Sequence, residues 1–307
     1  MDNDKWTSDA VRDAVLNNNQ HLEIVLSNYF QAFVGRLGDY HISIQGFAGT
    51  DQLLQKVLEG IDSLEVLRKD FIAVVGIFAP SEHPFLGKYL PAFFEKLLNF
   101  YEENGITLYT GTNADLLRND HYRFFNQHLF ISLIALLVEY ECFDTLYALF
   151  STKFHIYYKS SGIVRSVNFM HFRGYNYVLN EFLNTNQPKR ISVTADYIYK
   201  YSGPAEFAKL IKTDILLYYI SLWNRSDDAL DPYWYPELSV YNREKYILPK
   251  LVSKSYFERA KVLFGVKTIN QYKSLLDNTA DPLQRGGVYR VPQLKTGLMY
   301  ETVASEE

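Results

Sequence analysis

Apolar residues recur three and four positions apart over most of the chain, which is the pattern of helices that bury one face. In residues 22–34, for example, Leu22, Leu26, Phe30 and Phe33 fall on one stripe. The same pattern predicts further helices at about 53–61, 62–79, 86–103, 120–139, 143–151, 168–184, 192–200, 205–223, 255–264 and 268–277. Because no fixed-period repeat links these segments, we expect an all-α fold built as an irregular multi-helix bundle.

Two segments depart from the helical pattern. Residues 154–167 are rich in Tyr, Ser and β-branched residues and contain Ser161-Gly162, so they predict a small β-hairpin. Residues 281–307 contain Gly286-Gly287 and Pro292 but few apolar runs, so they predict an extended C-terminal tail. We therefore expect one α-helical domain over 1–280, with a soft subdivision near 150–167, followed by the tail.

Composition places the chain among globular proteins. It is 48% hydrophobic and contains 25 Tyr and 21 Phe, which is too apolar for a disordered chain. The single cysteine, Cys142, has an apolar neighbour in Phe143 and is expected to be a packed, reduced thiol. The most apolar run, Leu129–Val138, is about half the length of a membrane span. Since the first residues also lack a signal-peptide pattern, we expect a cytoplasmic protein.

Charge is unevenly distributed although the net value is only −4. Residues 1–120 carry 9 Lys and Arg against 17 Asp and Glu, a net of −8, whereas residues 121–307 carry 22 against 18, a net of +4. Oppositely charged halves favour association, either within the chain or with a protein partner or a second copy. The same distribution disfavours a uniformly basic nucleic-acid binder.

The segment RFFNQH at 123–128 is the sharpest candidate for chemistry. Its Arg and His spacing resembles the motif of HEPN ribonucleases, which are all-α proteins that dimerise around such a helix. The resemblance implies that His128 transfers a proton at the ribose 2′-hydroxyl and that Arg123 stabilises the pentacovalent phosphate. Arg123 and His128 have the matching chemistry, a permanent bidentate cation and a group that titrates near neutral pH. The alternative is structural: a solvated Arg in a helix turn and a His at the core edge.

Other catalytic patterns are missing from the sequence. It contains no Walker loop, GxGxxG or GxSxG segment, and its histidines show no metal-ligand spacing. His121 and His128 are seven residues apart, which is too far for two ligands to share a metal without a third. We therefore expect neither a metal site nor a cofactor.

Two further segments are candidates for binding. Residues 250–273 carry six cations against Glu258 alone, and the candidate binding residues among them are Lys250, Lys254, Arg259, Lys261 and Lys267. These residues form either a solvated basic face or a surface for a partner or nucleic acid. Trp234 and Tyr235 belong to a Pro-flanked aromatic loop, which indicates either an interface hot spot or a plug at the end of a helical core.

Residues 124–150, 234–236 and 256–266 together resemble a loosely defined group of bacterial helical proteins, some of which occur in anti-phage defence contexts. The resemblance implies a bacterial setting and carries over no catalytic residue. We therefore expect a non-enzymatic interaction or regulatory protein, an accessory or sensor subunit of a bacterial assembly. The alternatives are a HEPN-like, metal-independent endoribonuclease that uses Arg123 and His128, and nucleic-acid binding through 250–273.

Overall fold

The computed structural model describes residues 7–17, 21–43, 50–81, 83–106, 108, 117–159, 161–184, 190–224, 233–285 and 289–306. Their regular elements are mostly helical, and the prediction of an all-α fold with a small hairpin is confirmed. The α-helices are α1 Ser8–Leu16, α2 Leu22–Arg36, α3 Thr50–Phe78, α4 Pro84–Glu103, α6 Asp120–Glu139, α7 Phe143–Ser151, α8 Val193–Trp223, α9 Lys254–Ala260, α10 Ile269–Asn278 and α11 Leu294–Gly297. The strands are β1 Phe154–Tyr158 and β2 Ile163–Val167.

Short helical turns complete the described secondary structure. Most of them are 3₁₀ turns, and the segment at 178–182 is a π turn. They are η2 Leu37–Tyr40, η3 Ala79–Ser81, η4 Phe169–Phe172, η5 Val178–Phe182, η6 Glu237–Tyr241, η7 Pro249–Val252, η8 Lys261–Phe264 and η9 Pro282–Arg285.

The chain divides into two compact units in place of the expected single domain over 1–280. Unit 1 comprises residues 1–136 and 152–185, and unit 2 comprises residues 137–151 and 186–307. The chain crosses between the units after residues 136, 151 and 185.

The core of unit 1 is aromatic. Phe71 of α3 and Phe93 of α4 stack with their ring centroids 4.8 Å apart, and Phe33 of α2 meets Phe93 edge-on at 5.4 Å. Phe172 follows the hairpin and lies 4.7 Å from Phe130 of α6 and 5.1 Å from Phe154 of β1. Such contacts combine a large buried area with favourable ring geometry, so they fix the hairpin and its following turn to the helices.

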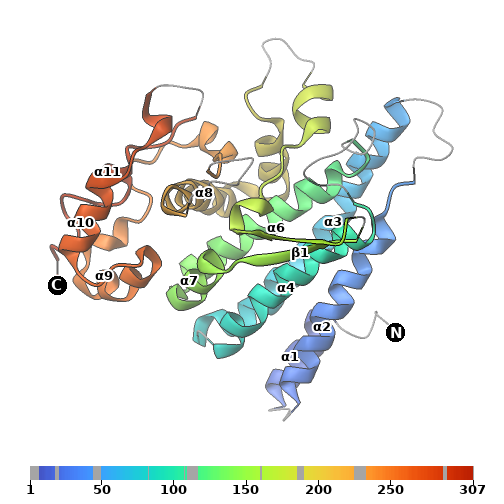
Figure 1. Ribbon diagram of the computed structural model, residues 1–307, viewed down its shortest axis with the longest axis horizontal. Helices are drawn as coiled ribbons and strands as arrows, with labels where there is room; N and C mark the ends of the chain where they lie inside the picture. Colours follow the sequence, from blue (N-terminus) through green and yellow to red (C-terminus); the bar gives the residue numbers. More distant parts are fainter. Residues whose placement is uncertain are drawn as a thin grey trace. The chain divides into compact units, whose positions relative to one another are not determined.

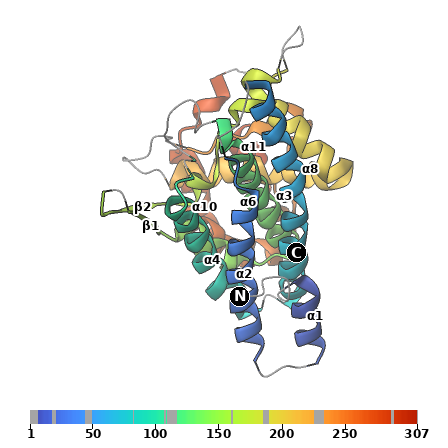
Figure 2. The same ribbon diagram turned by 90° about the vertical axis from the view of Figure 1, so that its right-hand side faces the viewer.

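The hairpin is antiparallel and pairs Phe154 with Val167 and Tyr158 with Ile163. Phe154 and Ile156 face the core and are buried, because alternate residues of a strand point to opposite faces. The turn end of the hairpin projects beyond α4 (Figure 2). The face that carries Phe154 and Ile156 is therefore on the core along β1, whereas the opposite face of the hairpin is in solvent.

Unit 2 is organised around α8, which the pattern predicts as two helices at 192–200 and 205–223. Gly203 adopts φ +72° at the junction, a conformation open to glycine, and Pro204 follows it. The two predicted segments therefore meet at a kink and form one interrupted element, shown as α8 in Figure 1. Beyond the kink nearly every residue from Leu210 to Leu222 is buried.

The prediction of an extended tail over 281–307 is wrong for the residues that the structure describes. Leu294, Leu298 and Val303 are buried in unit 2. The chain end also pairs with η7, since Ala304 donates to the carbonyl of Leu251 and Glu306 to that of Val252. It pairs with α9 as well, because the N–H of Lys254 donates to the carbonyl of Glu306. The sequence pattern did not predict this packing, because the apolar residues of the chain end are isolated and follow neither helical nor strand periodicity. They pack in the core of unit 2, which is organised around α8.

The predicted helix at 168–184 and the membrane-span criterion can both be checked against the described helices. A helix at 168–184 is wrong, because Asn168 caps the short turn η4 and an irregular segment separates that turn from η5. The described helices include none with the length and mean hydropathy that a membrane span requires. The Gly286-Gly287 segment lies outside the described residues.

Candidate functional site

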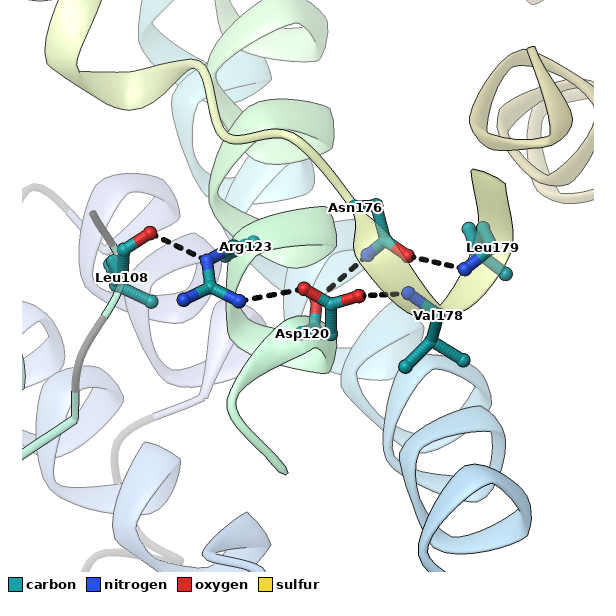
Figure 3. Close-up of polar contacts among 6 residues, drawn as sticks. All are labelled: Leu108, Asp120, Arg123, Asn176, Val178 and Leu179. Carbon is teal, nitrogen blue, oxygen red and sulfur yellow. Dashed lines mark hydrogen bonds and ion pairs between the residues drawn. The ribbon is translucent and has the colours of Figure 1, made fainter. Parts of the chain in front are cut away.

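Arg123 lies inside unit 1 and not in a cleft. Its Nε donates a hydrogen bond of 2.5 Å to the carbonyl of Leu108, and a terminal nitrogen lies 2.7 Å from Oδ1 of Asp120 (Figure 3). The side chains of Arg123 and Asp120 are 1% and 0% exposed. Gly174 approaches closely enough that a Cβ there would lie 3.1 Å from Cβ of Arg123. The guanidinium is therefore committed to a buried ion pair and lacks access to an RNA phosphate.

Asp120 connects α6 to the segment after the hairpin. Its second carboxylate oxygen accepts a hydrogen bond of 2.5 Å from the N–H of Val178, and its backbone carbonyl accepts one of 2.9 Å from Asn176 (Figure 3). Asn176 in turn accepts from the N–H of Leu179 at 2.9 Å. The two side chains satisfy N–H groups at the start of η5, which would otherwise lack partners. The network therefore holds residues 176–179 against α6.

Burial raises the pKa of Asp120 to about 7, although the Arg123 guanidinium and the backbone N–H groups of Tyr177 and Val178 act in the opposite direction. A carboxyl group that titrates near neutral pH can mark a catalytic acid or base. Here each oxygen already holds a protein donor and the side chain is inaccessible, so its contacts support a structural role.

His128 belongs to a second buried network, between α6 and α3. Its Nδ1 lies 2.8 Å from one carboxylate oxygen of Glu65, and Arg68 donates from Nε to the other oxygen at 2.8 Å. Arg68 also donates to Ser132 at 3.0 Å. Burial alone would raise the pKa of Glu65, but the contacts with His128 and Arg68 outweigh it and hold that pKa below its ordinary value. All four side chains are buried.

The nuclease motif is thus not assembled as a site. Residues five apart on an α-helix are rotated by about 140°, and Arg123 and His128 accordingly join different networks. His128 is 0% exposed, so neither side chain can reach a 2′-hydroxyl in solvent. The structural alternative included a solvated Arg123, and that part of it is wrong because α6 is buried on all sides over its first half.

The remaining buried histidines also have structural surroundings. His121 lies 2.9 Å from the carbonyl of Tyr40 and close to Gly60. Burial lowers the pKa of His121 and of His171 to about 3 in each case, so both rings are neutral at physiological pH. No three His, Cys, Asp or Glu side chains converge as metal ligands within the described parts of the chain.

The basic segment is partly neutralised by a residue outside it. Glu141, at the turn between α6 and α7, forms ion pairs with Lys250 at 2.8 Å and with Arg259. Lys261 pairs with Glu258 at 2.5 Å. Lys254 and Lys267, at the starts of α9 and α10, are exposed, and neither forms an ion pair with another described residue. The sequence could not reveal the role of Glu141 because 109 residues separate it from Lys250.

Trp234 is a core residue, so its prediction as a binding residue is wrong. It is 0% exposed, its indole donates to Asp214 at 2.6 Å, and its N–H donates to Ser221 at 2.9 Å. Tyr235 beside it is half-buried. The aromatic loop therefore closes the core around α8, which was the alternative left open by the sequence.

Sequence reasoning missed the edges of the hairpin. Asn99 of α4 donates to the carbonyl of His155 at 2.8 Å and accepts from the N–H of Tyr157 at 2.9 Å. Glu95 accepts from the N–H of His155 at 2.8 Å. These side chains take the place of a third strand along β1. The signal was present as two polar residues four apart on α4, but it has meaning only once the strand lies beside them.

The opposite edge of the hairpin is open. His155 and Tyr157 direct their backbone groups to α4, and they lie across from Ser166 and Val164. Backbone directions alternate along an antiparallel pair, so the N–H and C=O groups of Val164 and Ser166 point away from β1. We call these four groups the β2 edge. They have no hydrogen-bond partner among the residues that the structure describes.

Apolar side chains surround the β2 edge. Ile163 and Val164 are each 59% exposed, and Tyr157, across from Val164 on the same face, is 48% exposed. On that face Ser166 Oγ lies 3.0 Å from Nδ1 of His155, which ties the strands together. Unpaired backbone groups beside exposed apolar side chains allow a sheet to accept another strand. The β2 edge is therefore our candidate functional site.

The chain matches no protein-family model, no curated protein and no solved structure.

Proposed function

We propose that this protein is a non-enzymatic interaction protein that binds an extended segment of a partner along the β2 edge. The observation that carries the proposal is the outward direction of the Val164 and Ser166 backbone groups beside exposed Ile163. A docked strand would satisfy these groups and cover the apolar side chains, which supplies both directionality and buried area.

The anchoring of the hairpin supports this proposal. Asn99 and Glu95 hold β1 from one side, and Phe154 packs against Phe172 beneath it. A partner strand would therefore meet an ordered edge, and little conformational entropy would be lost on binding. In this proposal the protein acts as an accessory subunit of a larger cytoplasmic assembly, and a bacterial defence system is one setting that the resemblance implies.

The experiment compares two substitutions at one position. Val164→Pro removes the outward N–H without removing a hydrogen bond between β1 and β2, whereas Val164→Ala shortens the side chain and keeps the N–H. We expect a partner that co-purifies with the wild-type protein to co-purify with Val164→Ala and to be lost with Val164→Pro. Retention of that partner by a folded Val164→Pro variant would overturn the proposal. Ser166→Pro tests the second N–H of the edge in the same way.

A further inference from the structure

The positive charge of the hairpin influences which kind of partner strand can bind along the β2 edge. Residues 153–167 contain Lys153, Lys159 and Arg165 and no Asp or Glu. Lys159 is 57% exposed and lies 3.8 Å from Glu103, which is a weak pair at that exposure. Lys153 is exposed and precedes β1. The hairpin therefore presents positive charge to a docking segment.

The charges nearest the hairpin are arranged asymmetrically. Glu95 contacts β1, and Glu103 lies near the turn. Arg165 is the charged residue of β2 itself. It is half-buried between the two outward-facing positions and forms a hydrogen bond with the side chain of Tyr158 on β1. The charge that β2 itself carries is therefore positive, whereas the described carboxylates that act on the hairpin, Glu95, Glu102 and Glu103, belong to α4 on the β1 side.

This arrangement discriminates between a second copy and another partner. Two hairpins placed edge to edge would bring six cations together with no carboxylate of their own, and like charges opposite each other destabilise a sheet. A charged residue in an edge strand is a device by which natural sheets avoid pairing with themselves. An acidic strand would meet the opposite situation, in which attraction adds to the backbone hydrogen bonds.

Resting on the proposed function, we propose that the β2 edge binds an extended acidic segment of a partner in which carboxylates alternate with apolar residues. The apolar residues pack on the face that carries Tyr157 and Val164, because alternate residues of a strand share a face. The carboxylates lie on the face of Arg165.

Three labelled hexapeptides test the proposal by fluorescence anisotropy with the full chain. They alternate Val with Glu, with Thr or with Lys. We expect the Glu peptide to bind most tightly and the Lys peptide least. Arg165→Gln is expected to weaken binding of the Glu peptide about three- to fivefold and to leave the Thr peptide unchanged. Lys56→Gln, which neutralises an exposed lysine on α3, is the matched control and should change neither.

The outcomes separate the two proposals. If the Glu and Thr peptides bind equally and Val164→Pro abolishes both, strand addition stands and the acidic class is wrong. If Val164→Pro binds the Glu peptide as the wild type does, the attraction is not strand addition and the proposed function fails as well. Sedimentation of the free protein supplies a third result: a dimer that Val164→Pro dissociates would make a second copy the occupant and overturn the acidic partner.

Discussion

Oδ1 of Asp214 accepts a hydrogen bond of 2.6 Å from the indole Nε1 of Trp234, and its other oxygen accepts one of 2.7 Å from the N–H of Leu238. One buried carboxylate of α8 thereby fixes both the aromatic loop and the start of η6. Trp234, which the sequence offers as a surface hot spot, is therefore a buried residue that is held in the core by its hydrogen bond to Asp214.

Replacement of Asp214 by Ala should therefore destabilise the protein. The substitution leaves two buried N–H groups without an acceptor, and each such loss costs about 1–3 kcal/mol in the free energy of unfolding. Trp234→Phe should cost less, because it removes one donor and leaves the other bond. Urea denaturation gives both values. The exposed Tyr246 provides a control, and Tyr246→Phe should stay within about 0.5 kcal/mol of the wild type. An equally small effect of Asp214→Ala would contradict the anchor.

The buried pair of Asp120 and Arg123 makes a second prediction. Arg123→Leu leaves a buried carboxylate without its cation, which should lower the free energy of unfolding by about 3–5 kcal/mol. The additional change Asp120→Asn should recover part of the loss. Arg12 pairs with Asp9 at 3.8 Å on the surface, and Arg12→Leu should cost less than about 1 kcal/mol. If the two arginine substitutions lowered the free energy of unfolding equally, burial would not determine how much the Asp120–Arg123 pair contributes to stability.

Acid should destabilise unit 1 through its buried histidines. The pKa of His121 and of His171 is about 3 in the folded protein, below the ordinary value of 6.5. Their contribution to stability is therefore present above pH 6.5 and is lost as the pH falls toward 3. Asp120 acts in the opposite sense. Its pKa is raised to about 7, so its contribution is present below pH 3.8 and is lost as the pH rises through about 7.

The variant His121→Gln isolates one of these contributions. Between about pH 4 and 6 its free energy of unfolding should vary less steeply with falling pH than that of the wild type, by about 1.4 kcal/mol per pH unit for one proton. Chemical denaturation across the pH series measures the slope. His21→Gln, at an exposed position, is the control substitution. Parallel slopes for wild type and His121→Gln would mean that His121 is not protonated on unfolding.

Gly297 and Tyr219 make a prediction about the chain end. A Cβ at Gly297 would lie 2.5 Å from the hydroxyl of Tyr219, which donates to the carbonyl of Pro292 at 2.7 Å. Gly297→Ala should therefore lower the free energy of unfolding by about 1–3 kcal/mol. Tyr219→Phe in the same chain removes the nearest of the three close atoms and leaves ring carbons at 3.0 and 3.1 Å, so the two substitutions together should cost less than their sum in a double-mutant cycle. If the losses in the free energy of unfolding were additive, the Cβ introduced by Gly297→Ala would not clash with the hydroxyl of Tyr219.

A control for that cycle lies on α3. A Cβ at Gly76 meets no atom within 4 Å, and the residue is within a helix. Gly76→Ala should stabilise the protein by about 0.5–1 kcal/mol through its better helix propensity. Thermal denaturation then shows opposite signs for two glycine-to-alanine changes.

The periodicity of apolar residues predicted the local structure better than it predicted the candidate site. It placed α6 and α7 at the bounds that they have in the fold, and it located the hairpin from its turn and its β-branched residues. It separated α8 into two helices because Gly203-Pro204 looks like a break. Local patterns contain the information for such elements, since a helix face or a turn depends on residues a few positions apart.

The polar residues of α6 mark where such reasoning stops. Asp120 and Arg123 share one side of α6 and His128 lies on another, and the sequence does not reveal that both sides are covered. Their partners Glu65 and Val178 lie more than fifty residues away. An apolar helix that carries both members of an i, i+3 ion pair is itself a sign of central burial, and this signal was available. The sequence held no such signal for the β2 edge. Which edge of the hairpin is covered depends on Asn99 of α4, which bonds to β1 in the folded protein.

The side chains of Asn99 and Glu95 also limit how the hairpin can associate. Fibre growth by strand addition requires two free edges per protein, one to receive a strand and one to offer for the next. Here a helix closes the edge of β1, and within the described chain the hairpin offers only the edge of β2. Two copies that paired through their β2 edges would therefore leave no hairpin edge for a third, so self-association through the described hairpin would end at a dimer and could not grow into a polymer.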